Sequence, residues 1–194
     1  MGELNSIRQN EELIERIGAA RVIPVIRVDD AAAAVERAHA VLETGHDVIE
    51  LTTTTADWPT ALRELRAAAP DAATGVGTVT TRAAAELAIE LGAAFLVSPY
   101  PAPVVAEAAE AAGVLFMEGG FTPDQIARAT DRGVAKLFPA HLGGIRYLRS
   151  LLSVLPGARI VPTGGIGPDV ADAWLEAGAF AVGGSEFGAV RSHA

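Results

Sequence analysis

A single lysine stands out among the residues that could do chemistry in this chain. Of its 15 Lys and Arg residues, only Lys136 is a lysine, and it lies within the apolar stretch Val134–Phe138. A genome rich in G and C would explain the excess of Arg, but it would not explain why one Lys is retained. Apolar surroundings favour the uncharged amine, which is a nucleophile toward ketones. Lys136 is therefore a candidate for forming a Schiff base with a keto substrate.

Glu50 is also a charged residue inside an apolar stretch, Asp47–Thr52. A charge that is buried without a partner is strongly unfavourable, so a buried salt bridge between Glu50 and Lys136 is one interpretation. It would be a poor stabilising device, because apolar replacements often serve as well. The other interpretation is catalysis. A Schiff-base nitrogen withdraws electrons, which makes cleavage of the substrate C3–C4 bond feasible, and a nearby carboxylate moves the protons.

The segments that must position these two residues alternate regularly. Eight short apolar stretches start about 20–25 residues apart and predict buried parallel strands, and seven segments between them have helical periodicity. The predicted strands are Arg21–Arg27, Asp47–Thr52, Ala72–Thr78, Ala93–Ser98, Val114–Met117, Val134–Phe138, Arg159–Thr163 and Ala179–Gly183. The predicted helices are Ala31–Thr44, Trp58–Ala69, Thr81–Leu91, Pro103–Ala112, Pro123–Asp131, Gly144–Leu155 and Pro168–Ala177.

This alternation predicts an α/β fold, a (β/α)8 TIM barrel that forms a single domain over residues 1–194. Glycines that follow five of the helical segments are typical of helix ends in β-α units: Gly45, Gly92, Gly113, Gly133 and Gly178. We expect an extra N-terminal helix near Asn10–Ile17 and a stub or missing eighth helix within Ser185–Ala194. An open doubly wound sheet is the alternative, but the Gly-rich turn usual after its first strand is lacking here.

Several polar side chains fall late in the predicted strands, where barrel active sites lie. Arg27 is in phase with Val25, and Thr163 is in phase with Val161. Phase alone does not set which face points inward, but only the lumen mouth offers such groups partners and water, so we expect both to face the lumen. Thr78 ends the third strand. An Arg at a strand end is often only a solvated surface residue, and we interpret Thr52, Thr53 and Thr55 as strand-forming residues.

Glycine pairs close the last two predicted strands, in Thr163-Gly164-Gly165 and in Gly183-Gly184-Ser185. Loops after the seventh and eighth strands of such barrels commonly bind phosphate through backbone N–H groups. Glycine lets the backbone approach an anion closely, so these segments are candidates for that role.

Composition excludes several classes of function. A net charge of −9 argues against nucleic-acid binding. The chain has no Cys and four scattered His, which argues against a metal site, and the chemistry above needs no cofactor. No stretch resembles a signal peptide or a membrane span, so we expect a cytoplasmic protein without a membrane partner.

Taken together, these residues resemble the class I Schiff-base aldolases that cleave 2-keto-3-deoxy-6-phosphogluconate (KDPG) or 4-hydroxy-2-oxoglutarate (KHG). The matching segments follow one another across nearly the whole chain. They are VIPVIR (Val22–Arg27), VIELT (Val48–Thr52), GVGTV (Gly75–Val79), FLVSP (Phe95–Pro99), AKLFPA (Ala135–Ala140), PTGGI (Pro162–Ile166) and VGGS (Val182–Ser185).

The resemblance implies roles for individual residues. It makes Lys136 the Schiff-base lysine and Glu50 the catalytic acid and base. It places Thr78 and Thr163 in the pyruvyl pocket. It implies that six further residues contact the substrate: Pro99, Phe138, Gly164, Gly165, Gly184 and Ser185. Of these, the three glycines and the serine would hold its phosphate. The family also implies a homotrimer and a small keto-acid substrate.

Departures from the family pattern concern the substrate. Many members have an Arg four residues after the Glu, where this chain has Thr54, so we assign the substrate carboxylate to Arg27. Glu118 replaces the usual Pro, His141 replaces a Glu after the lysine motif, and Glu186 follows the last glycine pair. A carboxylate beside a phosphate site opposes phosphate binding.

Two functions therefore remain open from the sequence. The first is a pyruvate aldolase acting on a 2-keto-3-deoxy sugar acid, with KDPG or a close analogue as its substrate. The second is a catalytically weak barrel that binds an acidic metabolite or acts as an oligomeric scaffold. The retained Lys136, with Glu50 and Thr163, favours the first strongly, whereas the expected stub of the last helix and Glu186 favour the second slightly.

Overall fold

A computed structural model describes residues 2–188 and has the eight strands that the sequence predicts. The strands are β1 (Val22–Ile26), β2 (Val48–Thr52), β3 (Ala73–Gly77), β4 (Phe95–Val97), β5 (Leu115–Gly120), β6 (Ala135–Leu137), β7 (Ile160–Pro162) and β8 (Val182–Gly184). The helices are α1 (Gly2–Ala20), α2 (Ala31–Glu43), α3 (Trp58–Ala68), α4 (Arg82–Glu90), α5 (Pro103–Ala112), α6 (Pro123–Thr130), α7 (Ala140–Val154) and α8 (Ala171–Glu176).

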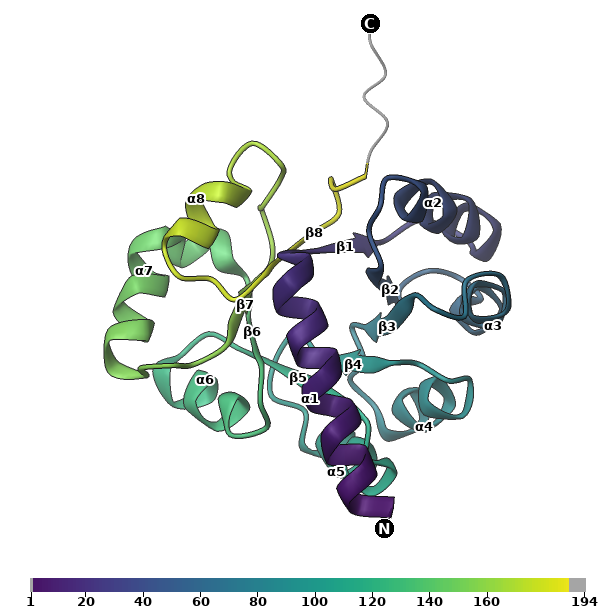
Figure 1. Ribbon diagram of the computed structural model, residues 1–194, viewed down its shortest axis with the longest axis horizontal. Helices are drawn as coiled ribbons and strands as arrows, with labels where there is room; N and C mark the ends of the chain where they lie inside the picture. The colour runs from purple at the N-terminus through teal and green to yellow at the C-terminus, as the bar shows by residue number, and fades with distance from the viewer. Residues whose placement is uncertain (1, 189–194) are drawn as a thin grey trace, which may run out of the picture.

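All neighbouring strands pair in parallel, in the order β7-β6-β5-β4-β3-β2-β1-β8. A bridge between Thr163 and Gly183 joins the two outer strands. Figure 1 shows helices α2 to α8 arranged as a ring around these strands. The α/β TIM barrel predicted from the sequence is confirmed.

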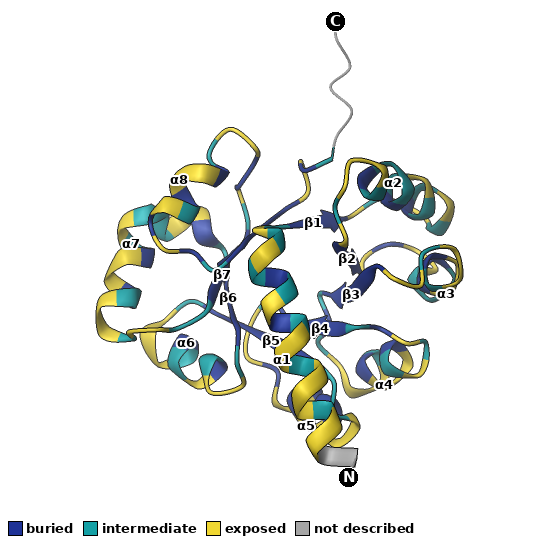
Figure 2. Cartoon of the chain, in the orientation of Figure 1, coloured by how far each residue is buried: buried dark blue, intermediate teal, exposed yellow. Residues whose placement is uncertain are grey.

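Two buried layers explain why the strands are apolar on both faces. Ile23, Val48 and Phe95 pack inside the barrel in one cluster, together with residues from the other strands. Ile26, Ile49 and other residues of opposite phase pack outward against the helices. The helices bury one side only, as Figure 2 shows, because their outer faces contact water.

Helix α1 closes the N-terminal end of the barrel. Ile14 and Ile17 are fully buried and belong to the same cluster as the lumen side chains, and Figure 1 shows α1 crossing over the centre of the ring. The extra N-terminal helix is thus present, but it is longer than the expected Asn10–Ile17 because its outer turns continue beyond the part that packs on the strands.

The remaining differences lie at element ends. Strand β5 runs to Gly120, three residues past its predicted end. Helix α7 begins at Ala140 and contains a kink at Gly144, where the φ is +66°. The helix predicted to start at Gly144 therefore corresponds to the part of α7 that follows the kink. Helix α8 has only six residues.

Residues 185–188 contain no helix, which agrees with the expected stub, and the rest of that expected helix lies outside the described residues. The five glycines expected at helix ends all adopt a positive φ. None of the described helices is both long and apolar enough to span a membrane.

Candidate active site

Lys136 and Glu50 face each other inside the barrel. The Nζ atom of Lys136 lies 3.7 Å from Oε1 of Glu50, and the two side chains are only 6% and 4% exposed. Lys136 is on β6 and Glu50 is on β2. Alternation along each strand turns both inward, because Val134 and Val48, two residues earlier, belong to the lumen cluster.

The contact between these two groups is an ion pair without a hydrogen bond. Glu50 Oε1 is buried and has no hydrogen-bond partner among the described residues. The lysine nitrogen lies 5.5 Å from the centre of the Phe138 ring, which covers it on another side. A buried ion pair stabilises a fold only when its geometry is good and its hydrogen bonds are satisfied. In this pair the N–H donors of Lys136 and the acceptor Oε1 of Glu50 stay free to bind a substrate.

Arg27 and Thr78 lie above this pair, at the carboxyl ends of β1 and β3. Arg27 Nη2 donates to Thr78 Oγ1 at 3.4 Å. Thr78 has a φ of +61°, which is unusual for a β-branched residue and places strain at this point. Thr53 donates its hydroxyl to the Thr78 carbonyl at 2.8 Å and helps to hold that conformation.

A cavity of about 180 Å³ opens beside these residues at the ends of β1, β6, β7 and β8. Val25, the register partner of Glu50, and Phe138, which covers Lys136, both contribute to its wall. The cavity therefore adjoins the buried pair. Its complete lining is Val25, Arg27, Phe138, Thr163, Gly164, Gly165, Ile166, Gly184, Ser185 and Glu186.

The cavity gathers most of the binding residues expected from the sequence. Pro99 and Thr78 are the two that do not line it: Pro99 follows β4, and its backbone packs against Gly119. The Thr163 hydroxyl lies close to Gly183 of β8: a Cβ built on this glycine would be only 2.6 Å from Thr163 Oγ1. The glycine in β8 thus leaves the space that the Thr163 hydroxyl occupies.

The glycine segments present backbone donors to the cavity. Gly164 and Gly165 have φ values of +98° and +70°, which other residues rarely adopt. Among the described residues, the N–H groups of Gly164, Gly165 and Ser185 donate to no carbonyl and to no side chain. Such groups are suited to hold an oxygen atom of a ligand.

Of the four residues that depart from the family pattern, Glu186 lines the cavity and the other three do not. Glu118 points out of the lumen, where its carboxylate accepts from the Ala102 N–H at 2.9 Å and contacts Arg132 at 3.3 Å. His141 packs over Gly165. The Thr54 hydroxyl lies 2.9 Å from that of Thr52.

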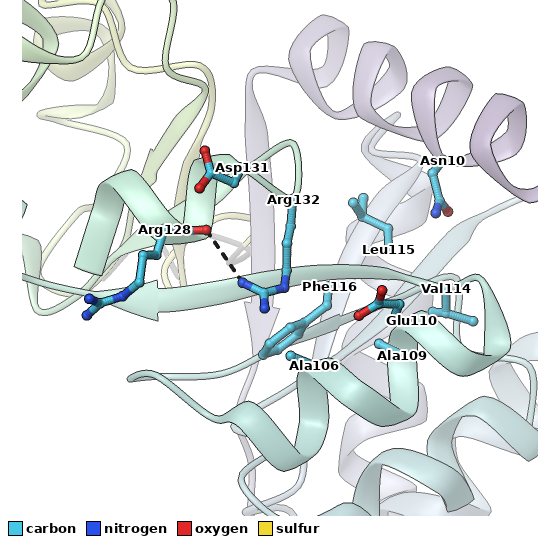
Figure 3. A pocket seen from close by; sticks show the side chains of 10 residues that line it. All are labelled: Asn10, Ala106, Ala109, Glu110, Val114, Leu115, Phe116, Arg128, Asp131 and Arg132. Carbon is cyan, nitrogen blue, oxygen red and sulfur yellow. Dashed lines mark hydrogen bonds between the residues drawn. The ribbon is translucent and has the colours of Figure 1, made fainter. Parts of the chain in front are cut away.

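A larger cavity, of about 610 Å³, lies away from this site (Figure 3). It is a groove lined by residues of α5, β5 and α6, and on its α6 side Arg132 donates to the Arg128 carbonyl. Lys136 and Glu50 line neither cavity, but only the smaller one is lined by Phe138, which covers Lys136, and by Val25, the register partner of Glu50. The described residues also contain no cluster of three or more His, Asp or Glu side chains suited to a metal ion.

Comparisons with known proteins point to one family. The model of the KDPG and KHG aldolase family matches residues 13–192. The 2-dehydro-3-deoxy-phosphogluconate aldolase of Haemophilus influenzae is 32% identical over 160 residues, which cover 81% of this chain and 76% of that protein.

Two solved structures extend the comparison. The KDPG aldolase of Legionella pneumophila, with pyruvate captured as a covalent carbinolamine intermediate, superposes with a TM-score of 0.81 at 30% identity, covering 88% of this chain and 85% of the other. The 2-keto-3-deoxy-6-phosphogluconate aldolase of Zymomonas mobilis with 3-phosphoglycerate superposes with a TM-score of 0.80 at 32% identity, covering 90% and 84%. The chain therefore belongs to the KDPG and KHG aldolase family.

Proposed function

We propose that this chain is a class I pyruvate aldolase that cleaves a 2-keto-3-deoxy sugar acid to pyruvate and an aldehyde, with Lys136 as the Schiff-base lysine. The observation that carries the proposal is the buried pair of Lys136 and Glu50, 3.7 Å apart without a hydrogen bond. Membership of the KDPG and KHG aldolase family supports it.

The first half of the reaction builds the Schiff base. Glu50 takes a proton from the Lys136 ammonium, and the free amine attacks C2 of the substrate. The new N–C2 bond forms as the carbonyl oxygen takes the proton back from Glu50, which gives a carbinolamine. The nitrogen then loses a proton to Glu50, and Glu50 passes it to the C2 hydroxyl, which leaves as water. The product is a protonated imine on Lys136.

The second half breaks the carbon–carbon bond. Glu50, again a carboxylate, removes the proton of the C4 hydroxyl, and the C3–C4 electron pair moves into the imine to give an enamine. C4 leaves as the aldehyde. C3 of the enamine then takes the proton from Glu50, and water hydrolyses the resulting protonated imine to release pyruvate and return Lys136 to its ammonium form.

Arg27 and Thr78 are the proposed site for the substrate carboxylate. The guanidinium lies at the mouth, in contact with the Thr78 hydroxyl, so a carboxylate there would accept charge-assisted hydrogen bonds from both. The keto carbon would then lie above Lys136, and the rest of the substrate would extend toward Thr163, Gly164 and Ser185. Pro99, Phe138, Gly165 and Gly184 complete the proposed binding set.

Trapping with borohydride tests the proposal. The protein is incubated with pyruvate and sodium borohydride, and its intact mass is measured. We expect one adduct with the mass of pyruvate less one oxygen atom, mapped by peptide analysis to Lys136. Absence of an adduct would favour the other function, a catalytically weak barrel that binds an acidic metabolite or serves as a scaffold.

We also propose that the protein is a cytoplasmic homotrimer, as the family resemblance implies. Tyr100 and Val104, at the β4–α5 connection, are 55% and 41% exposed and offer apolar surface to a neighbouring copy. Light scattering coupled to size-exclusion chromatography tests the oligomeric state, and a monomer would contradict it.

A further inference from the structure

The charges around the cavity are the observation that carries an inference about the far end of the substrate. Arg27 and Glu186 are the two charged residues in the lining. The Arg27 guanidinium reaches Thr78 on the β3 side, where the proposed mechanism uses it for the carboxylate. In the opposite part of the cavity, formed by the β7 and β8 loops, the charged group of the lining is the carboxylate of Glu186.

Glu186 is exposed, and its carboxylate lies beside the β7 loop. A Cβ built on Gly167 would lie 2.7 Å from Glu186 Oε2 and 2.9 Å from Asp169 Oδ1. Two carboxylates thus converge on the same glycine at the rim of the cavity. Neither forms an ion pair with a cation among residues 2–188, so their negative charge is not neutralised there.

The donors in this part of the cavity do not require an anion. The free N–H groups of Gly164, Gly165 and Ser185 donate equally well to the lone pairs of hydroxyl oxygens, and Glu186 accepts from hydroxyl hydrogens. A carboxylate roughly 5 Å from a phosphate dianion weakens its binding by about tenfold or more even in water-like surroundings.

From this arrangement we infer that Glu186 selects a substrate whose far end is an uncharged hydroxyl group in place of a phosphate. The inference rests on the proposed function, because it concerns the aldehyde half of the same reaction. Glu186 is a specificity-determining residue in it. Asp169, which lies at the rim and outside the lining, adds to the same field.

Condensation of pyruvate with two aldehydes tests the inference. The kcat/KM values for D-glyceraldehyde and for D-glyceraldehyde 3-phosphate are measured for the native chain and for Glu186→Gln, which keeps size and removes the charge. We expect Glu186→Gln to raise kcat/KM for the phosphorylated aldehyde by about tenfold or more. Because the Gln amide oxygen still accepts from a hydroxyl, the value for free glyceraldehyde should change by less than about threefold.

A matched control removes a charge of the same sign elsewhere. Glu176→Gln lies at the exposed C-terminal end of α8, and we expect it to leave both values unchanged. A ratio of the two aldehydes that Glu186→Gln does not alter would overturn the inference. Borohydride trapping of pyruvate on the same samples separates the two proposals, because pyruvate lacks the aldehyde half that would lie near Glu186. Lost trapping overturns the lysine mechanism, whereas intact trapping with an unaltered ratio overturns only the role of Glu186.

Discussion

Gly77 on β3 leaves the space that the Glu50 side chain occupies. A Cβ built on Gly77 would overlap Oε1 and the carboxyl carbon of Glu50, and the two residues lie on adjacent strands whose register places Gly77 beside Thr52. The carboxylate therefore sits where it does because the neighbouring strand has no side chain at that position.

Gly77→Ala is expected to displace the Glu50 carboxylate from Lys136. Because proton transfer by a positioned acid or base typically contributes 10²–10⁴-fold, we expect kcat to fall by about that factor. Steady-state kinetics measure it. Gly18→Ala, on α1, is the control: its Cβ would lie 2.7 Å from the Phe180 ring, so it strains packing far from Glu50 and should spare kcat. Equal losses in both variants would show that general packing, and not Glu50, is responsible.

Lys136→Met is expected to abolish both cleavage and borohydride trapping. Methionine fills the space of the lysine stem, and the chain has no other lysine to replace it. Glu50 is left buried without its partner, so the variant should also unfold at a lower denaturant concentration. Adding Glu50→Gln should restore part of that stability and none of the activity. Measurable turnover in Lys136→Met would contradict the Schiff-base mechanism.

Glu50→Gln should still form the pyruvate adduct, although slowly, and lose about 10²–10⁴-fold in kcat. The amide keeps the shape of the carboxylate but cannot accept the C4 hydroxyl proton. Single-turnover measurements together with thermal unfolding check this. An unchanged rate accompanied by reduced stability would instead favour the interpretation of the pair as a structural salt bridge.

Thr53→Val is expected to weaken binding at the Arg27 and Thr78 site. It removes the hydrogen bond that holds the Thr78 carbonyl, so the strained backbone can relax and move the Thr78 hydroxyl away from Arg27. We expect KM to rise several-fold with little change in kcat. Thr53→Ser retains the hydroxyl and should restore the native KM, and a raised KM in the serine variant as well would argue against this role.

Chelators are expected to leave cleavage unchanged. The protonated imine on Lys136 serves as the electron sink, so the proposed steps need no metal ion. The assay is turnover after dialysis against EDTA, with and without added Mg²⁺, Mn²⁺ or Zn²⁺. Loss of activity that a divalent ion restores would replace the lysine mechanism by a metal-dependent one.

The periodicity of the sequence predicts the barrel, and the inward direction of its key residues follows from a second consideration, because only the lumen mouth offers charged groups partners and water. Lys136, Glu50 and Thr163 are each two residues from a lumen side chain of their own strand, and alternation along a strand is a local property that a sequence displays directly. Helix ends can likewise be predicted from single glycines, because a glycine that ends a helix is also a local signal.

Features that depend on contacts between distant segments were not predicted. The sequence predicts a fifth strand that ends before Glu118, whereas β5 continues through this residue and alternation turns it outward. The sequence indicates only a strand former at Thr53, whereas its hydroxyl donates to the carbonyl of Thr78, which is 25 residues away. Likewise, only packing reveals that Gly77 makes room for Glu50. Alternation from Phe116 could have indicated the direction of Glu118.

Closure of the N-terminal end by α1 determines the order in which molecules leave. Ile14 and Ile17 fill that end of the barrel, so the carboxyl-end mouth serves for both entry and exit. Under the proposed mechanism the aldehyde occupies the outer part of this passage while the pyruvyl group is still bonded to Lys136 beneath it. The aldehyde must therefore depart first, and pyruvate last. Product inhibition patterns should accordingly be those of an ordered sequence, with pyruvate binding to the free protein.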